Sequence, residues 1–136
     1  GYCSDITRTF SFGEITEEQK LIYETVLEAE ESAIKAAQLG TKVGLIDQTA
    51  RKIITDAGYG QYFTHRIGHG LGIDIHEYPS MHQDNPLLLE EGMCFTIEPG
   101  IYIPEIGGVR IEDMIFMTKK GPLSLTKFPK QLQILK

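Results

Sequence analysis

The first forty residues change from an alternating pattern of polar and apolar positions to a helical one. In residues 5–10, Ile6 and Phe10 fall on one side of an extended chain and Asp5 falls on the other, together with two threonines, so this stretch predicts a strand. Residues 17–39 repeat apolar side chains every three or four positions, which predicts an amphipathic helix. The apolar stripe of that helix consists of Ile22, Val26, Ala29, Ala33 and Ala37, with Leu27 and Ile34 beside it.

Local signals mark the ends of this helix and of a second one. Thr16 and Gln19 have the spacing of a capping box, which predicts the start of the first helix. Gly40 predicts its end, because glycine readily adopts the left-handed conformation that stops a helix. A second helix is expected over residues 45–57 and is expected to end at Gly58.

The second half of the chain predicts strands and loops. Glycines and prolines are frequent over residues 62–86, which indicates a backbone that approaches another group closely. Strands are expected at 93–98, 108–117 and 123–126, and a turn at 119–122. Two helices followed by antiparallel strands predict an α+β fold, with the helices packed on the sheet.

Composition narrows the class of protein. A chain of 136 residues that is 41% hydrophobic and 24% charged suits one soluble domain. Its net charge of −6, without a run of lysine and arginine, argues against a nucleic-acid partner and against binding to anionic membranes. No apolar stretch is long enough to span a bilayer, and the N-terminus does not have the pattern of a signal peptide. Cys3 and Cys94 fit no metal-binding or redox spacing, so reduced thiols in a cytoplasmic protein are favoured over a disulfide.

Three carboxylates lie within or beside apolar, β-branched runs, namely Asp5, Glu98 and Glu112. A buried carboxylate without a partner is costly or takes up a proton, so such groups are normally paired or bind a metal. A salt bridge at a strand end explains any one of them. It does not explain all three together with His69, because converging carboxylates repel one another unless a cation is present.

The histidines add the nitrogen donor. All four lie in one short segment: His65, His69, His76 and His82. His69 lies between Gly68 and Gly70, which leaves room for an ion or a substrate to approach. Oxygen donors with one imidazole suit Mn²⁺, Co²⁺, Zn²⁺ or Fe²⁺, and carboxylates that bridge suit a site for two metal ions.

Other metal and nucleotide motifs are excluded. His76 and Glu77 do not open an HExxH motif, because serine occupies the position of its second histidine. Gly68, Gly70 and Gly72 do not form a GxGxxG motif, and the chain contains no P-loop, so nucleotide binding has no support. His82 is expected to be a surface residue.

Four motifs, in this order, resemble those of the pita-bread metallopeptidases, in particular aminopeptidase P and prolidase: SDITRTF, HRIGHGLGIDIHE, IEPGIYI and GGVRIEDM. The resemblance covers residues 1–126. It implies the C-terminal part of a pita-bread fold, in which helices pack on a curved antiparallel sheet. Residues 1–136 would then form part of a catalytic domain, without the N-terminal half of that fold and without any further N-terminal domain.

The resemblance also implies a set of metal ligands. Asp5 and Glu112 would bridge two divalent ions, and His69 and Glu98 would hold one of the two. A fifth ligand, an aspartate, would belong to a strand that precedes this sequence.

The remaining roles rest on the same resemblance. His65 and His76 would bind the substrate and stabilise the tetrahedral intermediate, and Glu98 would also transfer a proton. Arg110 would hold the bridging carboxylate from outside the metal's own ligands, with Tyr102 in the same network.

The implied activity is hydrolysis of an Xaa-Pro bond in a dipeptide or at a peptide N-terminus. Two divalent ions, with Mn²⁺ favoured over Co²⁺, Zn²⁺ and Fe²⁺, would activate a hydroxide in the complete protein. That protein is expected to form a homo-oligomer in the cytoplasm. This chain alone is expected to bind one ion or none and to be inactive.

Two alternatives stay open at this point. The first is an enzyme similar to methionine aminopeptidase, which belongs to the same family. The second is a non-catalytic binding module on the same scaffold. Retention of every available metal ligand favours an enzyme over a binding module.

Overall fold

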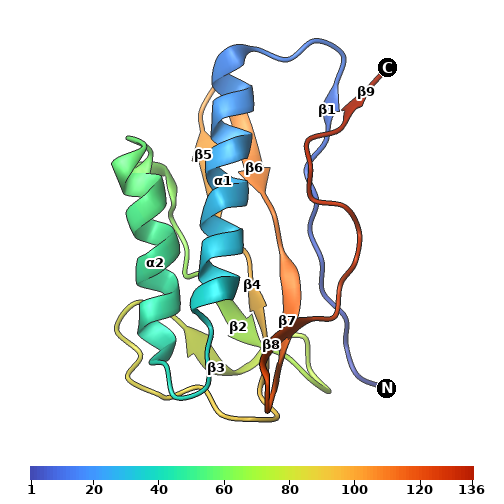
Figure 1. Ribbon diagram of the computed structural model, residues 1–136. Coiled ribbons are helices and arrows are strands. Elements are labelled where there is room, and N and C mark those ends of the chain that lie inside the picture. The colour runs from blue at the N-terminus through green and yellow to red at the C-terminus, as the bar shows by residue number, and fades with distance from the viewer.

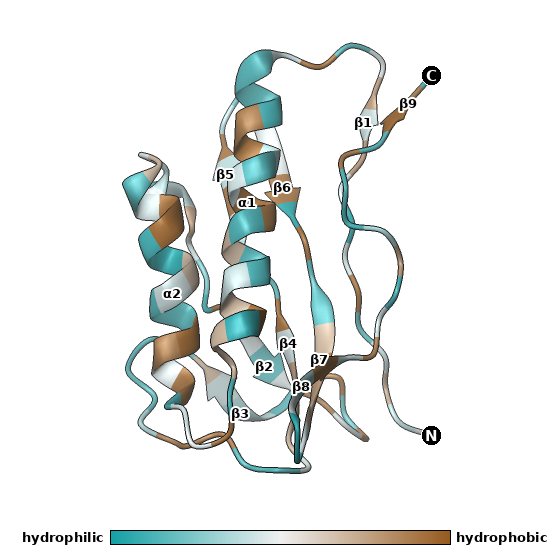
Figure 2. Ribbon diagram, in the orientation of Figure 1, coloured by the Kyte–Doolittle hydropathy of each residue, from teal (hydrophilic) through white to brown (hydrophobic).

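The computed structural model describes residues 1–136 and has two helices against one face of an antiparallel sheet (Figure 1). Helices α1 (Glu17–Ala36) and α2 (Val43–Asp56) lie side by side, and their apolar surfaces meet each other and the sheet (Figure 2). The predicted stripe of the first helix is buried along its whole length, at Ile22, Val26, Ala29, Ala33 and Ala37. The predicted α+β class is confirmed.

Both ends of α1 can be compared with the sequence. The capping box forms as predicted: Gln19 N–H donates to Thr16 Oγ1 at 3.1 Å, and Thr16 N–H donates to Gln19 Oε1 at 3.0 Å. The predicted stop at Gly40 is wrong, because α1 ends at Ala36 with Ala37 as its C-cap. Gly40, at φ +78°, belongs to the turn that follows, where its N–H donates to Leu89 O.

Helix α2 begins two residues earlier than expected, and the cause is tertiary. The N–H groups of Val43 and Gly44 donate to the carbonyl oxygens of Leu87 and Asn85, so a distant segment satisfies the first turn in place of a capping side chain. The predicted stop at Gly58 is confirmed, since this residue has φ +90° and follows the C-cap. A short 3₁₀ helix, η1 (Gly60–Tyr62), comes next.

The main sheet has five strands in the order β3-β2-β4-β7-β8, and every neighbouring pair is antiparallel. The strands are β2 (Gly68–Gly70), β3 (Glu77–Met81), β4 (Cys94–Ile97), β7 (Asp113–Thr118) and β8 (Gly121–Ser124). Strand β4 confirms the strand expected at 93–98. Strand β8 lies about where 123–126 was expected but begins at Gly121, inside the turn predicted at 119–122.

The single strand expected at 108–117 is wrong. The structure has two strands there, β6 (Gly107–Arg110) and β7, which belong to different sheets. Strand β6 pairs with β5 (Gly100–Ile103), whereas β7 pairs with β4 and β8. The break falls where Glu112 leaves the β4–β7 ladder and its backbone pairs with Thr7 instead.

The strand expected at 5–10 is also wrong, since only Thr7 forms a β-bridge there. Side chains replace the ladder: Thr9 Oγ1 donates to Arg110 O at 2.8 Å and accepts from Arg110 N–H at 3.1 Å. The first regular strand is β1 (Ser11–Phe12), which pairs in parallel with β9 (Ile134–Leu135) at the side of the molecule away from α2 (Figure 1).

Two glycines beside His69 allow close packing of backbones. A Cβ at Gly68 would overlap the carbonyl oxygen of Thr96, and one at Gly70 would overlap that of Tyr78. Both glycines are buried. The close approach that these glycines allow is therefore to neighbouring protein backbone, and not to an ion or a substrate.

Neither helix is long and apolar enough to cross a bilayer. Cys3 and Cys94 are free thiols, as expected.

Candidate metal centre

The break between the β4–β7 and β5–β6 ladders positions the two central carboxylates. Ile97 pairs with Asp113 on one side of the break and Gly100 with Arg110 on the other, so the register is unchanged across it. In that register Glu98 lies opposite Glu112. Side chains of directly opposed residues share one face, and two like charges in such a pair destabilise a sheet. The backbone therefore brings two carboxylates together at a cost that a bound cation would remove.

A further segment lies on each side of this pair. Glu112 N–H donates to Thr7 O at 3.0 Å, and Glu98 N–H donates to Ile67 O at 2.7 Å. Four chain segments are thus adjacent at one level, in the order Thr7, Glu112, Glu98 and Ile67.

Asp5 and His69 enter the site from the two outer segments. Each lies two residues from the residue that makes the outer hydrogen bond, and positions two apart along an extended chain face the same way. His69 Nε2 lies 3.6 Å from Asp5 Oδ2 and 3.2 Å from Glu98 Oε1. One ligand atom from each of Asp5, His69 and Glu112 can be chosen so that all three lie within 4.8 Å of one another. The structure therefore brings all four predicted ligands together.

Burial makes the charge of this cluster costly. Glu112 is 3% exposed, and its pKa is raised to about 7 because burial disfavours the ionised form and because Glu98 and Asp5 repel it, although Thr7 and Arg110 oppose the shift. A cation among these oxygens would reverse that balance, since it stabilises the ionised carboxylates.

The orientation of His69 fits a metal ligand. Its Nδ1 lies 3.0 Å from Gly70 O, a contact in which only a protonated nitrogen can donate. The neutral ring then carries its lone pair on Nε2, the atom that faces the carboxylates of Asp5 and Glu98. A lone pair directed at carboxylate oxygens is favourable when a cation lies between them.

Thr7 connects the predicted network around Glu112 and was missed in the sequence. Thr7 Oγ1 donates to Glu112 Oε2 at 2.5 Å and accepts from Arg110 Nε at 3.2 Å, so Arg110 acts on Glu112 through the threonine. A hydrogen bond with Tyr102 raises the pKa of Arg110, and nearby Glu112 and Glu98 raise it further. Thr7 lies two positions from Asp5, and this shared face is the signal that could have identified it.

Thr96 was missed for a similar reason. Its hydroxyl accepts from the N–H of His69 at 3.1 Å and donates to Glu98 Oε1 at 2.9 Å, which fixes two predicted ligands relative to each other. Thr96 is fully buried in β4, two positions before Glu98. Alternation along that strand places it on the same face.

The other histidines differ in their surroundings. His65 Nε2 lies 2.7 Å from the hydroxyl of Tyr102, which links His65 to Arg110. The ring of His76 is exposed and lies 4.3 Å from the ring of His69, measured between centroids. His82 is exposed as expected, and its Nδ1 accepts from the N–H of Asp84.

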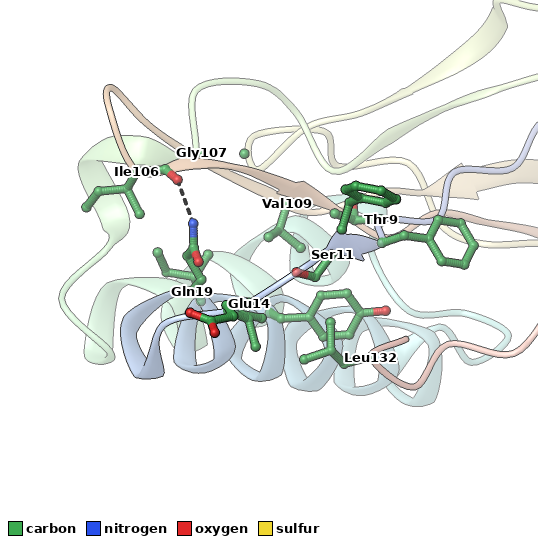
Figure 3. Close-up of a pocket in the computed structure, with 14 residues that line it drawn as sticks. Thr9, Ser11, Glu14, Gln19, Ile106, Gly107, Val109 and Leu132 are labelled. Atoms are coloured by element: carbon green, nitrogen blue, oxygen red, sulfur yellow. Dashed lines mark hydrogen bonds between the residues drawn. The ribbon is translucent and has the colours of Figure 1, made fainter. Parts of the chain in front are cut away.

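The cavity in Figure 3 lies outside this cluster. It has a volume of about 250 Å³ and is lined by residues 9–12 and 14–15, the first turns of α1, Ile106 with the start of β6, and Leu132. Gln19 Nε2 crosses it to donate to Ile106 O at 3.1 Å. Its one carboxylate, Glu14, is exposed, so the cavity offers no set of ligands comparable to the metal centre.

The donors fit a divalent metal. Three carboxylates and one imidazole converge from four chain segments, and their oxygen-rich chemistry matches first-row divalent ions. Glu98 and Glu112 lie opposite each other in the register of the sheet, and a bound cation would remove the repulsion between their carboxylates.

Comparison with known proteins gives related sequences along nearly the whole chain. YkvY of Bacillus subtilis (strain 168), whose name assigns it provisionally to the dipeptidases, is 63% identical over 135 residues, which are 99% of this chain and 37% of YkvY. The Xaa-Pro dipeptidase of Lactobacillus delbrueckii subsp. lactis is 53% identical over 135 residues, with the same two coverages of 99% and 37%. The chain thus spans somewhat more than a third of these relatives.

Solved structures share the fold. The dipeptidase from Pyrococcus horikoshii OT3 superposes with a TM-score of 0.96 at 53% identity, over 98% of this chain and 38% of that one. The Xaa-Pro dipeptidase from Bacillus anthracis does so with a TM-score of 0.96 at 49% identity, over the same shares of 98% and 38%. The N-terminal domain of the FACT complex subunit SPT16 from chickpea has a TM-score of 0.92 at 23% identity, which shows likeness of fold alone.

These matches confirm that the fold corresponds to the C-terminal part of the prolidase fold, as the motifs predicted. The model of metallopeptidase family M24 matches residues 1–119, most of the chain. The divalent-metal chemistry of this family agrees with the cluster of carboxylates and imidazole described above. The chain belongs to metallopeptidase family M24.

Proposed function

We propose that this chain is the C-terminal part of a peptidase that hydrolyses the Xaa-Pro bond of a dipeptide or of a peptide N-terminus. The placement of Glu98 opposite Glu112, with Asp5 and His69 directed at the same point, carries the proposal. The names of the related Xaa-Pro dipeptidases support the choice of substrate. The complete protein would extend beyond this chain, which spans 37% of those relatives.

Two divalent ions would be held by the predicted ligands. Asp5, His69, Glu98 and Glu112 would be the residues of this chain that hold them. Bound divalent ions at such a site activate water and polarise the scissile carbonyl. Mn²⁺ is proposed first, because three of the four donors are carboxylates.

Residues around the ions would handle the substrate. The exposed ring of His76, packed beside His69, can donate a hydrogen bond to an oxygen that gains negative charge in the transition state. His65 is held by Tyr102 and can contact the substrate from the other side of the network. Glu98 is a ligand that can also accept a proton from the attacking water and deliver it to the leaving nitrogen.

The alternatives differ in substrate or in chemistry. A protein similar to methionine aminopeptidase would use the same ligands on an N-terminal methionine. A binding module would have the fold without catalysis, and the likeness to the SPT16 domain shows that a shared fold does not by itself establish peptidase activity. The convergence of four metal-binding side chains favours the enzyme.

The test is an assay of the full-length protein that contains this chain, with added Mn²⁺. We expect Leu-Pro to be cleaved faster than Leu-Ala, activity to be lost on chelation, and activity to return when Mn²⁺ is restored. The His76→Ala variant should lower kcat by about 100-fold or more while metal content is retained. His82→Ala, which changes an exposed histidine with no contact to the site, is the matched control and should not alter kcat.

Other outcomes of this assay would favour the alternative functions. Cleavage of Met-Ala-Ser without cleavage of Leu-Pro would favour the methionine aminopeptidase reading. Metal binding without hydrolysis of any peptide would favour the binding module. Sedimentation of the same sample would test the proposed homo-oligomer, and fractionation of cells that make the protein would test its proposed cytoplasmic location.

A further inference from the structure

Arg8 is a buried arginine whose hydrogen-bonding capacity is fully used. Its side chain is 6% exposed, and all five of its N–H groups have acceptors. The acceptors are the carbonyl oxygens of Thr7, Glu112, Phe128 and Pro129 and the carboxylate of Asp113. The guanidinium therefore joins three segments that are far apart in sequence.

Two of these segments carry predicted metal ligands. Arg8 Nη1 donates to Thr7 O at 2.9 Å and to Glu112 O at 2.7 Å. The direct bond from Thr7 N–H to Glu112 O is longer, at 3.4 Å, and the two segments share only this one β-bridge. The arginine thus makes a shorter contact to the Glu112 carbonyl than the backbone ladder does.

The counter-charge of Arg8 is the next residue along the chain from Glu112. Arg8 Nη2 lies 2.7 Å from Asp113 Oδ1, and the Asp113 side chain is 2% exposed. Asp113 is held in turn by Thr126 Oγ1 at 2.6 Å and by Lys130 Nζ at 3.2 Å. The guanidinium and its anchor are therefore fixed on both sides.

We propose that Arg8 is a positioning residue that sets the spacing between Asp5 and Glu112, and thereby the affinity of the site for divalent ions. It touches no metal ligand side chain and acts through the two backbones that carry them. The inference rests on the proposed metal site. It adds that the N-terminal ligand is placed by an arginine, because a regular strand is absent there.

Lysine cannot replace this arrangement. Its ammonium has three donors that diverge from one atom, whereas the planar guanidinium presents five along two edges and reaches acceptors on opposite sides. Arg8→Lys keeps the charge that Asp113 requires but loses the simultaneous contact to Thr7 and Glu112. The variant therefore separates positioning from charge.

The experiment titrates the full-length, metal-free protein with Co²⁺ and monitors binding by visible absorption and by calorimetry. Thermal unfolding of the same protein is measured without metal. Arg51→Lys is the matched control. Arg51 pairs with Asp47 at 2.8 Å and donates to the carbonyl oxygens of Phe63 and His65, so it is also an arginine that joins segments, but it contacts neither Asp5 nor Glu112.

We expect both variants to lower the unfolding temperature, and only Arg8→Lys to weaken Co²⁺ binding, by about 10- to 100-fold, with a changed absorption spectrum. Unchanged affinity in Arg8→Lys, or equal losses in both variants, would overturn the proposal and leave the metal site intact. Absence of Co²⁺ binding in the unaltered protein would instead overturn the proposed function itself.

A second variant covers the case in which Arg8→Lys does not fold. Asp113→Asn keeps an oxygen acceptor for Arg8 and removes the negative charge that Arg8 shares with Lys130. We expect Co²⁺ affinity to fall several-fold in this variant. Affinity equal to that of the unaltered protein would overturn the proposal.

Discussion

Glu30 shows how one buried residue can make stability depend on pH without belonging to the metal site. It is fully buried on the inner face of α1, where Oε2 accepts from Lys130 Nζ at 2.8 Å and Oε1 has no hydrogen-bond partner. Burial raises its pKa to about 8, although the contact with Lys130 opposes the shift. The native protein therefore holds this proton well above the pH at which an unfolded chain releases it.

The two charged groups that act on Glu30, Asp113 and Lys130, titrate outside this range. Hydrogen bonds from Thr126 and Arg8 lower the pKa of Asp113 against the effect of burial, so its contribution to stability is lost only in acid, below its unfolded value of 3.8. The contact with Glu30 raises the pKa of Lys130 against the effect of burial, so its contribution persists up to its unfolded value of 10.5. Between these limits Glu30 is the member of the trio that titrates.

The sign of the effect follows from proton binding. Between its unfolded pKa of 4.5 and its native pKa of about 8, Glu30 binds more protons in the native state, so the free energy of unfolding falls as pH rises. Glu30→Gln is a neutral replacement without this dependence. We expect the variant to gain stability relative to the unaltered protein as pH increases from about 5 to about 8.5, as measured by urea unfolding of metal-free samples.

Glu31→Gln is the matched control for this measurement, because Glu31 is exposed on the same helix. Its stability difference from the unaltered protein should stay constant over the same range. A constant difference for Glu30→Gln as well would contradict a raised pKa at Glu30.

At the scale of elements, the contact between β2 and β4 decides where His69 lies. Gly68 packs directly on the carbonyl of Thr96, and Thr96 holds both the backbone of His69 and the carboxylate of Glu98. This strand pair is short, with a single register partner between Gly70 and Phe95. Loss of close packing at Gly68 would therefore displace a predicted ligand.

Gly68→Ala tests this dependence. The added methyl group overlaps a backbone atom that cannot rotate away, so the strands must separate, and overpacking of this kind costs about 1–3 kcal/mol. We expect a loss of that size in the free energy of unfolding together with weaker Co²⁺ binding. Denaturation of the full-length protein measures the free energy of unfolding, and titration with Co²⁺ measures the affinity for the metal.

Gly40→Asn is the control, since Gly40 has open space around it and asparagine tolerates its φ of +78°. It should leave Co²⁺ binding unchanged. Tight metal binding in Gly68→Ala would contradict a role for this strand contact in placing His69.

At the scale of the whole molecule, charge limits how many ions this chain can hold. Asp5, Glu98 and Glu112 supply three negative charges, whereas two divalent ions carry four positive ones. The predicted ligands lie in four separate segments, and the related proteins are much longer than this chain. A complete site for two ions is therefore expected to need a further carboxylate from outside residues 1–136.

We expect the isolated chain to bind at most one Mn²⁺ with high occupancy and to cleave Xaa-Pro peptides poorly, whereas the full-length protein binds two. Affinity should fall as pH falls, because Glu112, whose pKa is raised to about 7 by burial and by the neighbouring carboxylates, takes up a proton in competition with the metal. Metal analysis after dialysis, with a peptide assay on the same sample, checks both statements. Two tightly bound ions and full activity in the isolated chain would contradict the expectation.

Local interactions account for what the sequence alone determined. The buried stripe of α1 and its capping box involve residues three or four positions apart, so periodicity and end signals reveal them directly. The predicted ligands were identifiable because a carboxylate within an apolar run is costly unless something compensates for it. The motifs then indicated the family, which the comparisons confirmed.

Tertiary structure decided how these residues meet. The break that divides the strand expected at 108–117 lies at Glu112, whose backbone pairs with Thr7, 105 positions away. The common register of two separate ladders then sets Glu98 opposite Glu112. The positioning contacts of Arg8 and Thr96 likewise join segments distant in sequence. No local period encodes such partners, because their hydrogen bonds form only after the sheet has brought the segments together.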